Sequence, residues 1–521
     1  MALRAWSALL AGAVCLPGVA AAQFSPVGVP RGLLRLDLDG ALENVDRRYF
    51  DGQLQEFAGD LGSPALGRDR IPALGPADAR LARITGDPGA RLDLGNLTAT
   101  AQGSRTVGMI GFAVGLTSHL SIFARLPLVR ASVRTTLALD TTSSGAGANP
   151  ADLLLGSAEG AAQTSQFFQE FDAALQSLQA RLQSGAFSGT ALALAQSTLA
   201  AGTSLRADLF GLLLDPATLS SFVPTATSPL GAALAARIQG LQATLAGTLG
   251  VPGFTTGPAL PASRASQDDL NTYLTSANGT IAGRLDDTPL SQRGDAEVGG
   301  VWTLIDRWND DARGARLRVA ISGVARLGTG FPERADRFLD LGTGTGHSAF
   351  GGSVTADIGF GRFGVRAAGG YLRQLAANDV LRVTGADQPY APFSQVRTLR
   401  VDPGDVLSFG AHPFVRLLPP LAVHLGVDYW RRGDEQVAYL SADDSIPDIP
   451  ASLLALDSKI GVTTVSAGLT YARPGATKPG TTGVPLDAQW TFEQVIAGSG
   501  GRVRKTQSVR AGVRLYFRIF K

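Results

Sequence analysis

The sequence predicts an all-β transmembrane antiparallel barrel of about 12 strands, or about 14 if residues 32–49 form a hairpin, with an inserted α-helical subdomain. Three observations favour this fold class. Segments in which apolar and polar residues alternate recur along the chain, and the N-terminus has the pattern of an export signal. In addition, the connections between the alternating segments are short and long in alternation. The mature chain contains no run of about 18 apolar residues, the length that a membrane-spanning helix requires.

The composition excludes several classes of protein. Of 521 residues, 46 are basic, 44 are acidic and 17% are charged, whereas a soluble globular chain carries about 25% charged residues. The formal net charge of +2 gives no electrostatic attraction for nucleic acid, so no nucleic-acid partner is expected. With 45% hydrophobic residues, the chain is also too apolar to remain disordered.

Residues 1–22 have the pattern of a secretory signal peptide. Arg4 supplies a positive charge, residues 8–19 are apolar, and residues 20–22 provide small side chains for cleavage. A buried core helix is the alternative interpretation. The single cysteine, Cys15, lies inside this segment, so the mature chain is expected to lack disulfides, thiolate metal sites and cysteine nucleophiles. Export together with the alternating segments predicts a location in the cell outer membrane.

The C-terminal segment 509–519 carries the clearest strand pattern. Its odd positions are apolar, and its even positions include Arg510, Arg514 and Arg518. Alternation over about ten residues matches a membrane-crossing strand, whereas strands of soluble sandwiches usually span about 5–6 residues. The same pattern predicts that 295–521 consists of barrel strands, with further strands at 296–304, 317–327, 354–360, 363–371, 407–415, 421–429, 465–471 and 486–492.

The N-terminal part of the mature chain, residues 23–89, is expected to form a strand and loop region of the barrel. A strand is expected to start near Gly32, and Asp51-Gly52 is a dipeptide typical of hairpin turns. Residues 90–139 are expected to be barrel strands, at 91–101, 107–116 and 120–128, with the first two joined through 102–105.

Residues 140–294 differ from the rest of the chain. They are rich in Ala, Leu, Gln, Ser and Thr, and apolar residues recur at helical spacing in 167–182 and 230–245, with a third helical candidate at 188–214. We expect a helical insertion here. Outer-membrane barrels have short periplasmic turns and long extracellular loops, and this rule places the insertion at the extracellular mouth. The insertion would act either as a simple lid or spacer, or as a plug that controls the passage of a ligand.

Charged and imidazole side chains on the second face of the strands are the candidate lumen lining. They are Arg316, Arg318, Arg326, Arg366, Arg416, Arg510, Arg514, Arg518, Asp295, Glu297, Asp357, Asp428, Asp487, Glu493, His412 and His424. Such charges form selective rings in wide pores and interior ion pairs in narrow barrels, and about 12 strands favour the ion pairs. Aromatic residues on the apolar face predict girdles at the membrane interfaces, with ordinary core aromatics as the alternative: Trp302, Trp490, Tyr371, Tyr429 and Tyr471.

Several short motifs resemble a known family. Residues 115–128, which contain Gly115-Leu116-Thr117 and Pro127, resemble a hairpin of many bacterial outer-membrane barrels. Residues 294–299 and the Gly- and Thr-rich segments 327–330 and 341–346 resemble the strand opening and loop that follow it. Together they are similar to outer-membrane transporters associated with phenol meta-pathway degradation, which look like distant relatives of fatty-acid and aromatic-hydrocarbon channels. The resemblance implies a barrel that transports small hydrophobic molecules.

The combined expectation is an outer-membrane channel that passes small hydrophobic molecules passively, with no catalytic residues, no metal site and no cofactor. Its expected partners are outer-membrane lipid, the barrel assembly machinery and a small hydrophobic solute. Two alternatives remain open: a filled barrel acting as a structural or adhesin-like surface protein, and an outer-membrane hydrolase. His347 and Ser348 are the only pair that suggests a hydrolase, but neighbouring strand residues point to opposite faces. His412 and His424 face inward, yet a metal site needs a third ligand.

Overall fold

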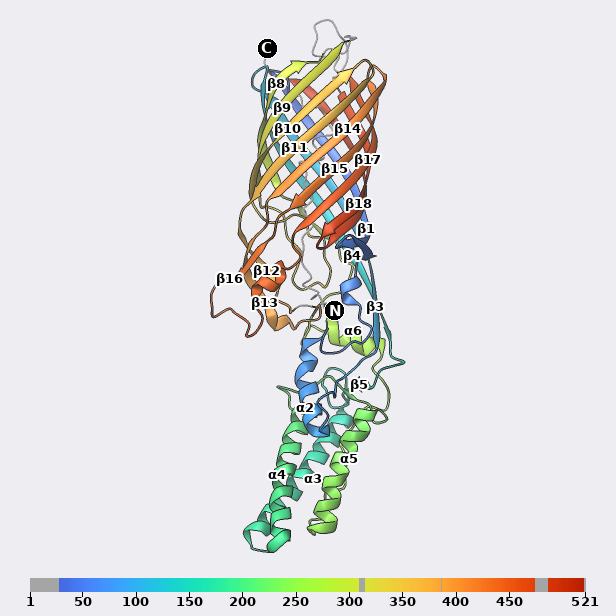
Figure 1. Cartoon of the computed structure of the whole chain (residues 1–521), viewed down its shortest axis with the longest axis vertical. Coiled ribbons are helices and arrows are strands. Elements are labelled where there is room, and N and C mark those ends of the chain that lie inside the picture. The colour runs from blue at the N-terminus through green and yellow to red at the C-terminus, as the bar shows by residue number, and fades with distance from the viewer. Residues whose placement is uncertain (1–27, 309–313, 386, 474–485, 520–521) are drawn as a thin grey trace.

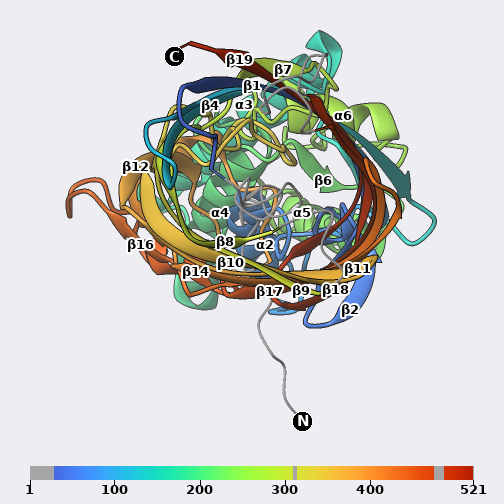
Figure 2. The ribbon, with the colours of Figure 1, turned by 90° about the horizontal axis from the view of Figure 1, so that it is seen from above.

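The computed structural model describes residues 28–308, 314–385, 387–473 and 486–519, so the predicted signal peptide lies outside the described residues. Twelve strands pair antiparallel in a ring, which closes where β19 pairs with β1. Figure 2 shows this ring along the barrel axis. The predicted fold class is therefore confirmed. The ring strands are β1 (Leu33–Phe50), β3 (Asn96–Gly115), β4 (Leu120–Asp140), β8 (Ala296–Arg307), β9 (Ala315–Leu327), β10 (Ala349–Phe360), β11 (Phe363–Gln374), β14 (Val406–Leu418), β15 (Leu421–Arg432), β17 (Ile460–Arg473), β18 (Leu486–Gly500) and β19 (Val503–Arg518).

The two ends of the barrel carry different kinds of connection. At one end, which we call the turn end, short links such as 116–119, 361–362 and 419–420 join neighbouring strands. The other end is called the helical end, because the helices project from it (Figure 1). Long links leave this end, except between β18 and β19, which residues 501–502 join directly. Short β2 (Gln53–Glu56) and β7 (Leu290–Arg293) add to the ring strands near this end.

Two local predictions near the N-terminus are wrong. Residues 91–101 and 107–116 do not form two strands, because β3 runs unbroken and pairs residue by residue with β4. Gly103, inside the predicted turn, allows close packing instead, since a Cβ added there would lie 2.6 Å from Val45 Cγ1.

Residues 32–49 likewise do not form a hairpin, because β1 continues to Phe50. The chain reverses at Asp51-Gly52 and returns as β2, as the dipeptide predicts. The φ values of 46° and 78° at these residues are those of a tight hairpin turn with two left-handed positions.

The outward face of β4 changes character along its length. From Leu120 to Leu128 the outward residues are apolar and mostly exposed, whereas from Arg130 onward they are polar. The inward face changes in the opposite sense, from Ser121 and Arg125 to buried Val133 and Leu137. An exposed apolar belt on a closed barrel is the surface that lipid covers, so the barrel has the surface of an outer-membrane protein and its lipid boundary lies at Leu128/Arg130.

The neighbouring strands place this boundary at the same height. Ser104 on β3 pairs with Ser132, and Asn44 on β1 pairs with both Ser104 and Gln507 of β19. These four outward polar residues form a row just beyond the apolar belt. β3 and β4 therefore continue past the lipid boundary as a two-stranded projection.

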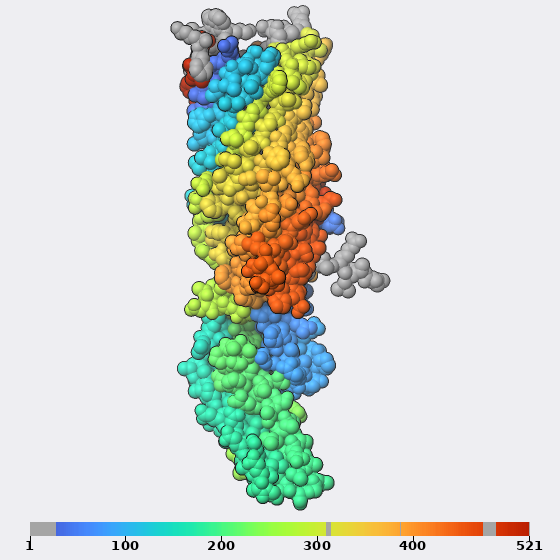
Figure 3. All heavy atoms as spheres, turned by 90° about the vertical axis from the view of Figure 1, so that its left-hand side faces the viewer, coloured from blue at the N-terminus to red at the C-terminus, as the bar shows by residue number. Residues whose placement is uncertain are grey.

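The helices form a body around this projection. They are α2 (Gly75–Thr85), α3 (Ala158–Gln183), α4 (Gly189–Leu213), α5 (Pro229–Ala243) and α6 (Gln267–Thr275). Ser157, Ser228 and Ser266 cap the starts of α3, α5 and α6 by accepting backbone hydrogen bonds, which satisfies N–H groups that lack a partner within the helix. Figure 3 shows the helical body extending the long axis of the molecule beyond the barrel. Among the described residues, no helix has both the length and the apolar character needed to cross a membrane.

One continuous apolar core joins the helices to the projection. Leu97 of β3 and Leu137 of β4 belong to the same buried cluster as Phe171 of α3 and Leu209 of α4. Helix α2, which precedes β3 in the chain, packs against α4 and α5. The helical body is thus assembled from 140–294 together with part of 23–89. A separate three-stranded sheet, β12 (Ala377–Arg382), β13 (Val396–Asp402) and β16 (Gln436–Tyr439), lies beside the helical end of the barrel (Figure 1).

Candidate functional site: the barrel lumen and its mouth

Small residues form one side of the lumen. Small residues occupy the inward positions at the centre of β9, β10 and β11. Ala320, which pairs with Thr355, is buried, whereas Ser322, Ser353, Thr355, Ala368 and Gly370 retain partial exposure. The hydroxyl oxygens of Ser322 and Ser353 lie 2.7 Å apart. Because these residues face the inside of a closed barrel, they are exposed to the lumen. We call these five residues the small-residue strip.

Charged lumen residues pair with one another across neighbouring strands. Their ion pairs replace the water that each charge loses inside a narrow barrel. The pairs, with their N–O distances, are Arg366–Asp357 (2.6 Å), Arg326–Glu297 (3.4 Å), Arg510–Glu493 (2.8 Å) and Arg514–Asp37 (3.6 Å). Ion pairs therefore occupy much of the lumen outside the small-residue strip.

The two inward histidines bind different partners. His412 Nε2 lies 3.0 Å from Asp428 Oδ1, whereas His424 lies near the hydroxyls of Thr470 and Thr491 at 3.5 and 3.4 Å. Within the described part of the chain, no group of three potential metal-ligating side chains is assembled. These residues thus form a buried polar network that links β14, β15, β17 and β18.

Aromatic and cationic side chains close the turn end of the lumen. The guanidinium carbons of Arg316 and Arg318 lie 4.8 and 5.4 Å from the ring centroid of Trp308. The Trp308 ring lies 6.2 Å from that of Phe414. The segment before β1 also enters this end, where buried Val29 packs in a cluster with Leu33, Ala113, Phe123 and Tyr516. The turn end is therefore narrowed from two sides.

Asp295 holds the loop between β9 and β10 at the helical end. Its carboxylate accepts hydrogen bonds from the backbone N–H groups of Gly330 (2.8 Å), Thr345 (2.7 Å) and Gly346 (3.3 Å) and from the Thr345 hydroxyl (2.9 Å). Thr343 Oγ1 donates to Arg293 O at 2.9 Å and accepts from the Phe331 backbone N–H at 3.1 Å. The motifs 294–299, 327–330 and 341–346 thus meet in one structural unit, in which Asp295 is a loop anchor.

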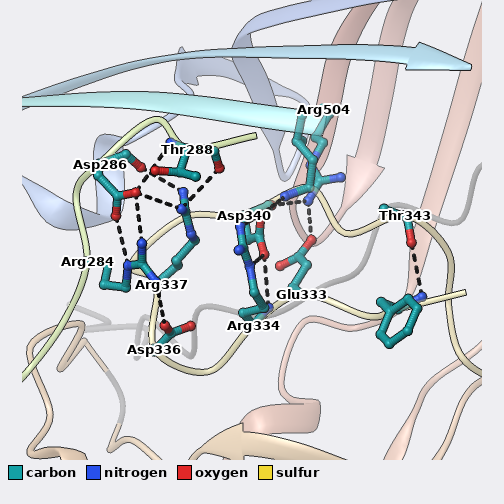
Figure 4. Close-up of polar contacts among 12 residues, drawn as sticks. Arg284, Asp286, Thr288, Glu333, Arg334, Asp336, Arg337, Asp340, Thr343 and Arg504 are labelled. Carbon is teal, nitrogen blue, oxygen red and sulfur yellow. Dashed lines mark hydrogen bonds and ion pairs between the residues drawn. The ribbon is translucent and has the colours of Figure 1, made fainter. Parts of the chain in front are cut away.

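Arginines and carboxylates crowd the mouth next to this loop (Figure 4). Arg334 Nε lies 2.8 Å from Asp340 Oδ2, and Arg504 pairs with Glu333. Although burial alone would raise it, hydrogen bonds from the Arg334 side chain and backbone hold the pKa of Asp340 below its usual range. Arg337 Nη1 donates to Asp286 O at 2.7 Å, and its Nη2 lies 3.0 Å from Asp286 Oδ2.

The remaining predicted lining residues lie near the barrel ends. Arg416 Nη2 lies 3.4 Å from Gly361 O, Asp487 accepts a 2.7 Å hydrogen bond from the Tyr516 hydroxyl, and Arg518 is exposed at the last position of β19. The predicted girdle residues sit at two heights on the outside. Trp302, Trp490 and the half-buried Tyr471 lie toward the turn end, whereas Tyr371 and Tyr429 lie toward the helical end.

The mouth residues were missed by sequence reasoning. Glu333, Arg334, Arg337 and Asp340 lie in a loop without periodicity, and Arg382 comes from a strand outside the barrel. Their one signal is the density of charge in 333–340, where the rest of the chain is poor in charge. His347 and Ser348 do not contact each other as nucleophile and base: His347 bonds Asp379 and Leu375, and Ser348 Oγ accepts from the Gly328 backbone N–H.

Comparison with known proteins was made at three levels. No protein-family model matches the chain, and no curated protein sequence matches it. Solved structures similar to it include outer-membrane channels and the translocator domain of the autotransporter NalP from Neisseria meningitidis. An outer membrane channel from Pseudomonas putida F1 has a TM-score of 0.42 at 9% identity, covering 95% of this chain and 98% of that one.

Two further solved channels have lower scores. A Pseudomonas aeruginosa FadL homologue has a TM-score of 0.27 at 10% identity, covering 99% of this chain and 100% of that one. The Pseudomonas putida toluene transporter TodX has a TM-score of 0.25 at 12% identity, covering 99% and 96%. All these TM-scores are below the range that is typical of two proteins with the same fold. The assignment of a barrel therefore depends on the strand pairing of this chain alone.

Proposed function

We propose that this protein is a passive channel for small hydrophobic molecules in the outer membrane, with the helical body on the extracellular side. The observation that carries the proposal is the small-residue strip. A barrel kept only as a rigid scaffold gains stability from filling its interior, whereas this strip leaves partly exposed serine, threonine, alanine and glycine at the barrel centre.

The closures at both ends support a gated rather than a permanently open pore. Trp308, Arg316 and Arg318 narrow the turn end, and the loop anchored by Asp295 lies at the helical end. A solute that passes along the strip must displace these groups, and loop movements of this kind occur without large changes in a rigid barrel. In the absence of a solute, the turn-end side chains and the loop held by Asp295 would exclude bulk water from the lumen.

The transported class is inferred from the small-residue strip and from the composition of the lumen. The strip presents methyl, hydroxyl and backbone groups without charge, while the lumen arginines of the four pairs above already have carboxylate partners. A neutral, largely apolar solute would lose little hydration energy on this path, whereas a strongly hydrated ion would lose more than the strip returns. We also expect the barrel assembly machinery to recognise β19, whose outward residues Val509, Val513 and Phe517 face lipid.

Entry of a hydrophobic dye into intact cells tests the channel. Expression of the protein is expected to speed uptake of N-phenyl-1-naphthylamine across an intact lipopolysaccharide layer. Ser353→Trp is expected to abolish the gain by filling the strip. Val354→Trp, the neighbouring outward residue with 52% exposure, is the matched control and should keep it. Equal uptake by wild type and Ser353→Trp would mean that solutes do not follow the strip, and no gain for any variant would favour a filled barrel.

A second candidate function rests on the shape of the molecule. The helical body projects far beyond the lipid boundary on a two-stranded support (Figure 3). A filled barrel that presents this body as a surface platform would explain the projection without any passage. Uptake of N-phenyl-1-naphthylamine by intact cells separates the two functions, because a platform would not speed entry of the dye, whereas the proposed channel would.

A further inference from the structure

A small pocket lies at the mouth between the β9–β10 loop, the ends of β1 and β19, and the loop after β12. Its volume is about 70 Å³, and it is partly open to solvent. Its lining residues are Arg48, Phe57, Glu333, Arg334, Ala335, Arg337, Phe338, Leu339, Asp340, Arg382, Thr384, Pro389, Arg502 and Arg504. Figure 4 shows the loop that carries Glu333, Arg334, Arg337 and Asp340 next to Arg504. We call this cavity the mouth pocket.

Positive charge exceeds negative charge around the mouth pocket. Six arginines line it, and the carboxylates that pair with them within the described residues are Asp60, Asp286, Glu333 and Asp340. Asp60 is shared between Arg48 and Arg502. Asp286 is likewise shared between Arg337 and Arg284. The pocket wall therefore attracts an anion.

Arg382 is the least compensated of these cations. Its residue is only 7% exposed, and its Nη1 donates to the carbonyl oxygens of Ile281 and Ala391, both at 2.9 Å. Its Nε donates to Ala335 O at 3.2 Å. The Nη2 atom is buried and has no hydrogen-bond partner among the described residues, and no described carboxylate lies within ion-pair distance of the guanidinium. A buried charged donor without an acceptor costs free energy until a ligand supplies one.

Aromatic rings stand beside this donor. The guanidinium carbon of Arg382 lies 6.0 Å from the ring centroid of Phe338, and Phe57 contributes a second ring to the pocket wall. Leu339 and Pro389 add further apolar surface. The wall of the mouth pocket thus contains a guanidinium that has no ion-pair partner among the described residues, although Asp336 attracts it from farther away, and flat apolar groups lie next to it. This combination is the complement of an oxyanion attached to an aromatic ring.

We propose that the mouth pocket binds the carboxylate of a small aromatic acid, and that Arg382, which lines the pocket, supplies the positive charge that holds this carboxylate. The inference deepens the proposed channel function, since it rests on the barrel passing small apolar molecules and adds an anionic class captured at the entrance. Binding in the mouth pocket would place the aromatic ring next to the loop held by Asp295, on the path to the small-residue strip.

Calorimetric titration of the full-length protein in detergent tests this proposal without any transport step. Benzoate is the probe, benzyl alcohol is its neutral analogue, and inorganic phosphate tests for a general anion site. Benzoate is expected to bind, benzyl alcohol to bind at least about tenfold more weakly, and phosphate to fail to displace benzoate at equal concentration. No benzoate binding, or equal binding of benzyl alcohol, overturns the proposal. Displacement by phosphate would show a plain anion site and overturn the aromatic acid.

A matched pair of variants locates the donor. Arg382→Gln is expected to weaken benzoate binding at least about tenfold. The control, Arg397→Gln, removes a partly exposed arginine that donates to backbone carbonyls of Ser394, Val396 and Asp444, and it should leave the affinity unchanged. Unchanged affinity in Arg382→Gln overturns the assignment. If the Arg382→Gln variant fails to fold, the relative affinity of the wild-type protein for benzoate and benzyl alcohol still tests whether the pocket binds a carboxylate. Dye uptake is measured separately. A protein that binds benzoate but does not speed dye uptake would contradict the proposed channel function and would still support the proposed binding pocket.

Discussion

His347 Nε2 lies 2.8 Å from Asp379 Oδ2, and this contact connects the start of β10 to the three-stranded sheet beside the barrel. His347 Nδ1 lies 3.1 Å from Leu375 O. Both ring nitrogens therefore face acceptors, an arrangement that only the doubly protonated imidazolium satisfies. Burial opposes the charge, but the hydrogen bond and attraction of Asp379 outweigh it and raise the pKa of His347 above its ordinary value.

The contact predicts a pH-dependent stability of the mouth. Because the folded-state pKa of His347 exceeds its unfolded value, the stabilisation is complete below about pH 6.5 and is lost as pH rises through the folded-state pKa. His347→Gln should lower the unfolding free energy by about 1.5 kcal/mol at pH 5.5 and by much less at pH 9. Urea unfolding at both pH values measures this. His119→Gln, whose ring bonds Thr303 O at the turn end, is the control. An equal loss at both pH values would mean that His347 acts only by packing.

Removing the loop anchor should open the mouth. Asp295→Ala leaves the backbone N–H groups of Gly330 and Thr345 without their acceptor, at a local cost of about 3 kcal/mol for charge-assisted hydrogen bonds. We expect faster proteolysis within 328–347 and faster uptake of the hydrophobic dye. Asp172→Asn removes a carboxylate that pairs with Arg206 within the helical body and serves as the control. Unchanged proteolysis in Asp295→Ala would show that neighbouring contacts hold the loop.

The barrel was predictable because lipid and lumen impose a period of two on every ring strand. The alternation in 509–519 and in 421–429 needs no knowledge of distant residues, and both segments are ring strands. The connection at 102–105 was predicted wrongly because the same period continues while the two faces exchange polarity at Leu128/Arg130. When one face of a strand is assumed to contact lipid along its whole length, a point at which the apolar and polar faces exchange is interpreted as the end of the strand.

The mouth could not be predicted for a different reason. Arg382, Arg504 and Glu333 are far apart in the chain and meet only through the folding of one loop and two strand ends. Their residue types are ordinary for surface loops, so nothing local marks them. The anchoring role of Asp295 was also hidden, since its position on the second face of a strand is equally that of a plain lumen charge.

The lipid boundary on β4 predicts a large effect of a substitution at one outward position and a small effect of the same substitution at another. Leu126→Arg places a charge within the apolar belt and should destabilise the barrel by about 2 kcal/mol, whereas Thr136→Arg lies on the exposed polar side of the boundary and should change stability by less than about 0.5 kcal/mol. Reversible unfolding in phospholipid vesicles measures both. A similar loss for both variants would place the boundary farther along the strand than Leu128/Arg130.

Deletion of 142–289 tests how far the helical body contributes to folding. With a flexible linker of about twelve residues across the gap, the membrane-embedded ring should still form and keep its heat-modifiable mobility on gels. The projection should not survive intact, because Leu97, Val133 and Leu137 would lose the helices that bury them, and each exposed side chain costs about 1.5–3 kcal/mol. Proteases should therefore cut β3 and β4 beyond the row of Ser104 and Ser132. Replacing these three apolar residues by threonine in the deletion variant is the control and should reduce aggregation. Loss of heat modifiability in both forms would show that the helices are needed to close the ring.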